Sequence, residues 1–280
     1  MVAFFLRERA WYALLVAVFV ALSGIVLLLV QSYRVIDRDL TEGILARRQS
    51  VSYLAATILS EKFDRLTDVG RSFATRVQFR QMIGDGKWNQ ASEILRSVPQ
   101  DFPFIERLFL TDPSGLMMAD IPELPGVRGK DFSDRDWYKG VSHAWEPYVS
   151  NIYTRYVQPQ FNVVATAVPI KGNKQEVLGI LVLQIKINTF LDWIKGIDIG
   201  PGGQVFVVDR KGTLASHPII NAQSKLVDFS TVPSVQRALH GERGVDILSN
   251  PIDNEENVVA YEPITKYGWG VVVGQPKAKA

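Results

Sequence analysis

The chain has 280 residues, enough for one large domain or two ordinary ones. Apolar residues make up 47% and charged residues 21%, which is a globular rather than a disordered composition. A formal net charge of +2 gives no broad basic field, so nucleic acid is a poor candidate partner. The absence of cysteine excludes disulfides, thiol nucleophiles and cysteine-based zinc sites.

Residues 10–30 form an uninterrupted apolar run that begins with Ala-Trp-Tyr and contains no charge. A helix of this length spans roughly 30 Å, the thickness of a bilayer's hydrocarbon core. A cleaved signal peptide is the alternative, but its apolar region is usually only about 7–15 residues long. We therefore predict a transmembrane helix over 10–30, after a short tail over 1–9. Arginines flank both ends of the run, so charge alone leaves the orientation open.

A helical pattern follows the apolar run. Between residues 40 and 77, apolar side chains recur mostly at steps of three or four, and no proline interrupts 31–98. We predict a stalk helix and helical lead-in over 31–98, with a stop at Asp85-Gly86. The alternative is two helices broken near Gly70. An exposed apolar stripe predicts a homodimer through the stalk helix, although the spacing is too irregular for a sustained coiled coil.

Strand patterns begin near residue 104, where two apolar stretches flank the turn Pro113-Ser114-Gly115 and predict a β-hairpin. A short helix is expected over 134–142, with Ser133 as its N-cap. Further strands are expected over 145–153, 161–170 and 177–187, and a connecting helix over 188–197. The predicted fold class is thus α+β.

The second half of the chain then repeats the first. The stretch FLTDPSGLM at 109–117 is echoed by VVDRKGTLA at 207–215, and NVVATAVPI at 162–170 by NVVAYEPI at 257–264. Each of the latter two stretches is followed by a turn and an apolar strand. Two echoes in the same order indicate two copies of one structural unit, with chance matching of common hairpin turns as the alternative.

A membrane anchor, a stalk helix and two tandem strand-rich modules together resemble the double Cache sensor family. The most specific residues of the resemblance are Arg135, Trp137, Tyr138, Tyr148, Val149, Ser150, Tyr153, Pro169 and Ile170. These domains are extracytoplasmic sensors of chemoreceptors, histidine kinases and cyclic-dinucleotide enzymes. The resemblance implies two PAS-like modules, each a curved antiparallel sheet flanked by helices. We call them the distal module, 99–197, expected to bind the ligand, and the proximal module, 198–276.

The resemblance also orients the chain. It implies that residues 1–9 are cytoplasmic and that the sensor lies on the periplasmic side of the inner membrane. Residues 277–280 would then lead into a second membrane helix. The expected function is to sense a small molecule and pass a conformational signal inward. The alternative is a single-pass, membrane-tethered binding or scaffold protein that acts through protein partners.

The cluster around Arg135 suits recognition of a small molecule. An arginine fork can hold a carboxylate with two hydrogen bonds. On a helix, Arg135 and Tyr138 would share a face, because they are three positions apart. Trp137 is open to two interpretations, a core side chain or a pocket wall. The alternative for Arg135 is an exposed pair with a neighbouring aspartate, which contributes little to stability.

Departures from the family pattern favour an anionic ligand. Members that bind amino acids carry aspartates where this chain has Arg155 and Gln184, and an aromatic residue where it has Lys130. Loss of two anions makes the site complementary to an anion rather than to a zwitterion. The predicted ligand residues are Arg135, Trp137, Tyr138, Tyr148, Tyr153, Arg155 and Gln184. The predicted ligand is an organic acid or another small anionic metabolite, with an amino acid less favoured. A solvent-exposed loop is the alternative for Arg155.

No sequence pattern indicates catalysis. The three histidines are far apart and lack metal-ligand spacing, and neither a nucleophile elbow nor a phosphate-binding loop is present. We therefore predict no enzyme activity in this chain, no cofactor and no metal site.

Overall fold

A computed structural model of the chain describes residues 2–216, 225–249 and 255–279; the side chains of 2–21, 36, 37, 39–41 and 216 lie outside that description. Two compact units are present, Met1–Arg47 and Arg48–Ala280. Within the part of the chain that the structure describes, no helix has both the length and the apolar character needed to cross a membrane. The predicted membrane helix over 10–30 and the tail over 1–9 lie partly outside the described residues.

Helix α1, Val2–Ala74, is continuous through Gly70, so the alternative of two helices broken near Gly70 is wrong. Gly70 instead allows close packing, because a Cβ atom there would lie 2.6 Å from Val168 Cγ2. The predicted stalk helix and lead-in over 31–98 do not form a single helix. After α1 the chain turns at residues 75–76 and continues as three short helices. These are α2 Val77–Gly84, α3 Trp88–Ile94 and α4 Val98–Asp101. A helix does end at the predicted stop, Asp85-Gly86, but it is the short α2, and the long helix ends earlier, at Ala74.

The distal module is built on an antiparallel sheet of order β2-β1-β6-β5-β3, with β4 also paired to β5. The hairpin and the two long strands are as predicted, but the strand expected over 145–153 is reduced to two short pieces. The strands are β1 Ile105–Thr111, β2 Met117–Ile121, β3 Tyr148–Val149, β4 Tyr153–Thr154, β5 Asn162–Lys171 and β6 Val177–Lys186.

Helix α5, Asp136–Ala144, covers one face of this sheet, and its N-cap is Arg135 rather than the predicted Ser133. The reason is local. The Asp131 carboxylate accepts a hydrogen bond from the Ser133 backbone N–H, and the Arg135 N–H donates to the Phe132 carbonyl. These bonds hold residues 131–135 in a turn, and the helix begins only after it.

The second sheet repeats the connectivity of the first, with order β8-β7-β11-β10-β9. The predicted connecting helix is present but shorter than expected. The elements are α6 Thr189–Ile194, β7 Gln204–Val208, β8 Leu214–Ser216, α7 Pro233–Leu239, β9 Gly244–Ser249, β10 Glu256–Ile264, β11 Trp269–Pro276 and the 3₁₀ helix η1 Lys277–Lys279. Two antiparallel sheets flanked by helices confirm the predicted α+β class.

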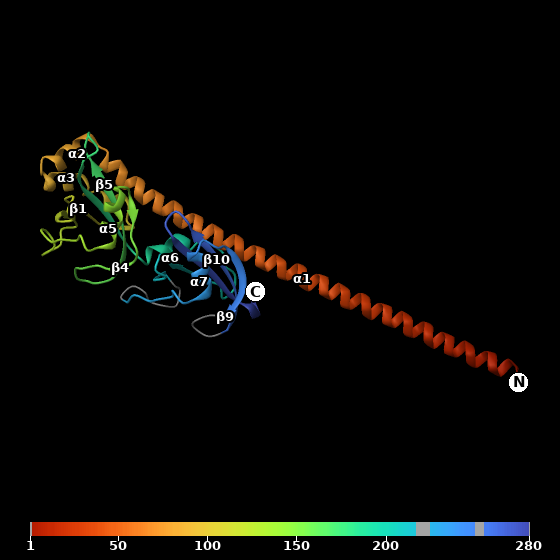
Figure 1. Ribbon diagram of the computed structural model, residues 1–280. Coiled ribbons are helices and arrows are strands. Elements are labelled where there is room, and N and C mark those ends of the chain that lie inside the picture. Colours follow the sequence, from red (N-terminus) through yellow and green to blue (C-terminus); the bar gives the residue numbers. More distant parts are fainter. Residues whose placement is uncertain (1, 217–224, 250–254, 280) are drawn as a thin grey trace. The chain divides into compact units, whose positions relative to one another are not determined.

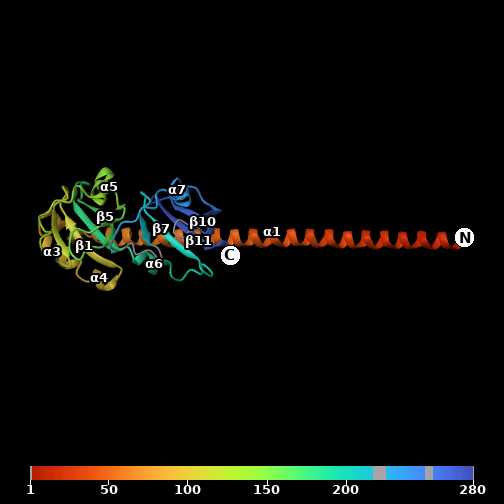
Figure 2. The ribbon, with the colours of Figure 1, turned by 90° about the horizontal axis from the view of Figure 1, so that it is seen from below.

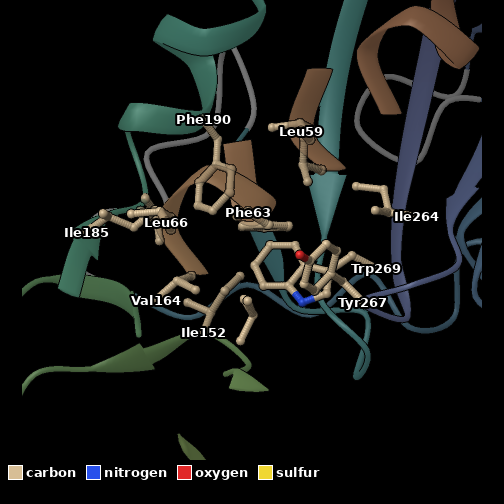
Figure 3. Packing of buried hydrophobic residues seen from close by; sticks show 14 of the residues in the cluster. Leu59, Phe63, Leu66, Ile152, Val164, Ile185, Phe190, Ile264, Tyr267 and Trp269 are labelled. Atoms are coloured by element: carbon tan, nitrogen blue, oxygen red, sulfur yellow. The ribbon is translucent and has the colours of Figure 1, made fainter. Parts of the chain in front are cut away.

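The two sheets follow one another along the C-terminal part of α1 (Figures 1 and 2). A single hydrophobic cluster fills the space between them and the helix. At its centre, Phe63 of α1 makes edge-on contacts with Phe190, Tyr267 and Trp269 at centroid distances of 5.7, 4.9 and 5.1 Å (Figure 3). The two sheets therefore share one core along α1.

Candidate functional site

The face of the distal sheet beneath α5 carries a second apolar cluster, distinct from the core along α1. Successive side chains of a strand point to opposite faces, so Phe109 and Val182 contact this cluster while Leu108 and Leu181 pack toward α1. Trp137 of α5 is buried here, edge-on to Phe109 at 5.5 Å. Of the two interpretations for Trp137, its packing is that of a core side chain.

Tyr138 connects α5 to the β1–β2 turn. Its hydroxyl donates to the Pro113 carbonyl at 3.0 Å, and its ring lies against Gly115. Arg135 precedes the helix with an extended backbone, so the helical face that Arg135 and Tyr138 were predicted to share does not form. The structure brings Arg135 instead toward Tyr153, whose ring centroid lies 5.9 Å from the guanidinium carbon.

A polar group lies within this otherwise apolar face. Gln184 of β6 donates from Nε2 to the Tyr153 hydroxyl at 2.9 Å, and its Oε1 is buried without a partner among the described residues. Arg107 of β1 is the neighbour of Gln184 in the sheet register. We call Arg107, Arg135, Tyr153 and Gln184 the polar cluster. It unites three of the predicted residues with one that sequence reasoning missed.

The arginines in and around the polar cluster differ in how well their charges are neutralised by carboxylates. Arg107 pairs with Asp120 at 2.7 Å, and both side chains are almost fully buried. Arg155, which is buried, pairs with the partly buried Glu106 at 2.5 Å. Among the described residues, the one acidic partner of Arg135 is Asp134 at 3.8 Å, and that aspartate is 78% exposed. Since solvent screens such a surface pair, Asp134 only weakly offsets the positive potential of Arg135 at the site.

Arg155 is therefore not the free cation that its place in the sequence suggested. Its Nε donates to the carbonyls of Pro159 at 2.7 Å and Val157 at 3.0 Å, and its guanidinium lies over the Phe161 ring. The alternative of a solvent-exposed loop position is wrong, because the residue is 4% exposed. Arg155 braces the loop over 155–160, with Glu106 as its counter-ion.

Tyr153 is held in its neutral form. Burial raises the pKa of the Tyr153 phenol above its ordinary value, and the opposing effects of the Gln184 hydrogen bond and of Arg135 and Arg107 are smaller. The hydroxyl accepts from Gln184, and the described residues supply no acceptor for its own hydrogen. It can thus donate one hydrogen bond to a ligand.

Tyr148 lies apart from the polar cluster, beside the first turn of α5. Its ring packs against Gly140, where a Cβ atom would come within 2.2 Å, and its hydroxyl donates to Asp136 at 3.4 Å. Burial raises the pKa of Tyr148, while the nearby Arg210 lowers it less. Of the predicted ligand residues, Arg135, Tyr153 and Gln184 converge; Trp137, Tyr138, Tyr148 and Arg155 serve packing or bracing contacts.

Two residues near the site escaped the sequence analysis. Glu106 and Arg107 are consecutive residues of β1; Arg107 forms a buried ion pair with Asp120, and Glu106 a partly buried one with Arg155. The available signal was a pair of opposite charges inside an otherwise apolar strand. In the described part of the chain, no group of three or more histidine, cysteine, aspartate or glutamate side chains could hold a metal ion.

We compared the chain with known protein families and structures. A sequence profile described as "Cache domain" matches residues 34–280. The chain belongs to the Cache domain family.

Two solved chemoreceptor domains share the fold across nearly their whole length. The periplasmic sensory domain of the Campylobacter jejuni chemoreceptor Tlp1 matches with a TM-score of 0.65 at 14% identity, covering 85% of this chain and 97% of that one. The ligand-binding domain of the Pseudomonas aeruginosa amino acid chemoreceptor PctB, in complex with L-Arg, matches with a TM-score of 0.64 at 16% identity, covering 85% and 97%. Identities this low show the common fold alone.

Two further relatives extend the comparison. The ligand-binding domain of the Pseudomonas fluorescens chemoreceptor CtaA, in complex with L-alanine, has a TM-score of 0.62 at 16% identity, covering 88% and 99%. The methyl-accepting chemotaxis protein McpA of Bacillus subtilis is 23% identical over 190 residues, which cover 68% of this chain but only 27% of McpA. The Cache domain of this chain is thus similar to the sensor regions of larger signalling proteins.

Proposed function

We propose that this chain is the extracytoplasmic sensor region of a transmembrane receptor, and that its distal module binds a small organic acid. The observation that carries the proposal is the charge of Arg135. Within the polar cluster, Asp120 already neutralises the other cation, Arg107, and outside the cluster Glu106 neutralises the neighbouring Arg155. One uncompensated positive charge near a sheltered hydroxyl donor favours a single negative charge on the ligand.

The polar cluster also suggests how the ligand is held. The guanidinium of Arg135 and the O–H of Tyr153 would bind the carboxylate, since charge-assisted hydrogen bonds are the stronger kind. The unpartnered Oε1 of Gln184 would accept a hydrogen bond from an uncharged donor on the ligand. A carboxylate that bears a hydroxyl group on the adjacent carbon satisfies all three groups.

An amino acid suits the same cluster less well, although PctB and CtaA have been crystallised with amino acids. An ammonium group requires a carboxylate or several acceptors. Here the two nearby acids, Asp120 and Glu106, lie in ion pairs with arginines. Placing an ammonium beside Arg135 would add like-charge repulsion to the cost of desolvation.

The remaining parts of the proposal concern signalling. The apolar run over 10–30 would anchor the chain in the inner membrane, with the sensor outside. Homodimerisation through α1 is supported by the exposed side chains of Tyr53 and Leu54. Ligand would shift the sensor between two conformations, which requires a higher affinity for one of them. Sedimentation equilibrium of the chain and of a Leu54→Glu variant tests the dimer, which the variant should weaken.

A thermal-shift experiment on the full chain tests the ligand class, because a ligand that binds only the native state raises the melting temperature. The probes are L-lactate, propionate, succinate and L-alanine at millimolar concentration. L-Lactate should stabilise most. Arg135→Gln should abolish the shift, whereas Lys139→Gln, which removes an exposed cation from the same helix, should preserve it. Stabilisation by L-alanine and not by the carboxylates contradicts the proposal. No shift with any probe favours a scaffold role.

A further inference from the structure

The repeated Asp-x-x-Gly stretches form the same turn in both modules. In the β1–β2 turn, Asp112 Oδ1 accepts from the backbone N–H groups of Ser114 and Leu116, both at 2.9 Å. In the β7–β8 turn, Asp209 Oδ1 accepts from those of Lys211 and Thr213, again at 2.9 Å. One carboxylate oxygen is therefore enough to cap each turn.

Asp209 differs from Asp112 in using its second oxygen. Asp209 Oδ2 accepts from the backbone N–H of Ile152 at 2.9 Å, a bond that joins the proximal turn to the distal module. The Asp209 side chain is fully buried, whereas Asp112 is partly exposed. Among the described residues, Asp112 makes no corresponding bond outside its own turn. The bond between Asp209 and Ile152 is therefore not needed to form the turn itself.

The next residue reaches the same distal segment. Arg210 Nη1 donates to the Tyr148 hydroxyl at 3.2 Å and lies 3.4 Å from Asn151 Oδ1, and its guanidinium carbon is 4.7 Å from the Tyr148 ring centroid. Two consecutive residues of the proximal module thus hold residues 148–152 of the distal module.

That distal segment in turn fixes the start of α5. Asp136, the first residue of the helix, accepts from the Asn151 backbone N–H at 2.7 Å and from Asn151 Nδ2 at 2.9 Å. Tyr148 donates to the same carboxylate at 3.4 Å. Arg135 is the adjacent N-cap residue, so its backbone direction depends on where Asp136 is held. Hydrogen bonds therefore connect Arg210 with the residue after Arg135 in two steps.

We propose that Asp209 and Arg210 are positioning residues for the distal ligand site: by holding residues 148–152 and Asp136, the β7–β8 turn sets the placement of Arg135. This inference rests on the proposed function for the identity of the site, but the contact itself does not. Because coupling between two sites is reciprocal, a ligand bound at Arg135 changes the strength of the contact with the proximal module by the same factor. The route for the signal then runs through the turn as well as through α1.

Hydrogen exchange of the full chain without ligand tests the contact. Loss of a charge-assisted hydrogen bond should raise the exchange of the amides it protects roughly tenfold. In Asp209→Asn and Arg210→Ala, the increase should cover residues 148–152 and extend to 135–144. Lys211→Ala removes an exposed cation from the same turn and should leave both segments unchanged. An increase confined to 209–213 overturns the proposal. If Asp209→Asn fails to fold, the exchange of the same segments in Arg210→Ala decides whether the proposal holds.

Titration with L-lactate separates the positioning role from the proposed function. Arg210→Ala should weaken lactate binding several-fold, Arg210→Lys should restore part of it, and Lys211→Ala should leave it unchanged. Unchanged affinity in Arg210→Ala contradicts a positioning role even if exchange increases. If the wild-type chain does not bind lactate, the proposed function fails, and exchange over 135–144 alone decides whether the turn places Arg135.

Discussion

Replacing Gly70 with alanine tests how α1 packs on the distal sheet. Gly70 lies in a continuous helix, where alanine is intrinsically preferred over glycine by about 1 kcal/mol. If the glycine served only as a flexible point, Gly70→Ala would stabilise the protein by that amount. The geometry predicts the opposite sign, because the new Cβ would lie 2.6 Å from Val168 Cγ2 and 3.0 Å from Leu183 Cδ1.

The expected magnitude follows from these two opposing effects. Carbon atoms pack best at about 3.5–4.0 Å, so α1 or the sheet must shift by roughly 1 Å. Overpacking of a core costs about 1–3 kcal/mol, and the upper half applies because Val168 is stiff and Leu183 is also buried. After subtraction of the helix propensity, the net loss is about 1–2 kcal/mol. For a unit of this size, the melting temperature should fall by about 2–8 °C.

Urea unfolding followed by circular dichroism measures this loss. Gly84→Ala, at the end of α2, is the matched control: its Cβ would meet only Leu178 at 3.8 Å, an ordinary contact, so stability should be unchanged or higher. Val168→Ala removes the atom that clashes, so the double variant should be more stable than the sum of the single effects. Higher stability of Gly70→Ala, or simple additivity with Val168→Ala, would refute the close-packing explanation.

Three further predictions concern stability. Phe63→Ala should cost about 3–5 kcal/mol by urea unfolding because it removes the centre of the shared core, whereas Arg65→Ala on the exposed side of α1 should change stability by less than about 0.5 kcal/mol. Asp120→Asn should cost about 3 kcal/mol or more in the same assay, because Arg107 would keep a buried charge without its counter-ion. Burial raises the pKa of Asp209, so the native chain keeps that proton to higher pH than the unfolded chain. Its contribution to stability should fall as pH rises from about 4 through the raised pKa, and urea midpoints of Asp209→Asn should lack this decline.

Local patterns predicted the strands and hairpins well. The β1–β2 and β7–β8 hairpins depend on turn residues that are close in sequence, and the long strands β5, β6, β10 and β11 on continuous runs of β-branched residues. The repeat was visible because each module places these elements in the same order. The ends of helices were less predictable. Ser133 is a suitable N-cap residue, but its backbone N–H donates to Asp131 within a turn, and the helix begins only after this turn, at Asp136.

Contacts between residues that are far apart in the chain could not be predicted from the sequence. Arg155 looked like a free cation because its counter-ion, Glu106, is distant in the chain and reaches it only through the folded sheet. Gly70 suggested a break because a sequence cannot distinguish a flexible glycine from one that permits close contact. Arg135 and Gln184 were recognised from the family resemblance. The contact of Asp209 with Ile152 could not be foreseen, because the repeat predicts only what Asp209 shares with Asp112.

The central claim is that Arg135 gives the distal site a preference for an anion over a zwitterion. Calorimetric titration of the full chain with L-lactate and L-alanine tests it most directly, since the two ligands differ only by a hydroxyl in place of an ammonium group. We predict that L-lactate binds at least tenfold more tightly, the factor that corresponds to about 1.4 kcal/mol. Equal or tighter binding of L-alanine would contradict the account.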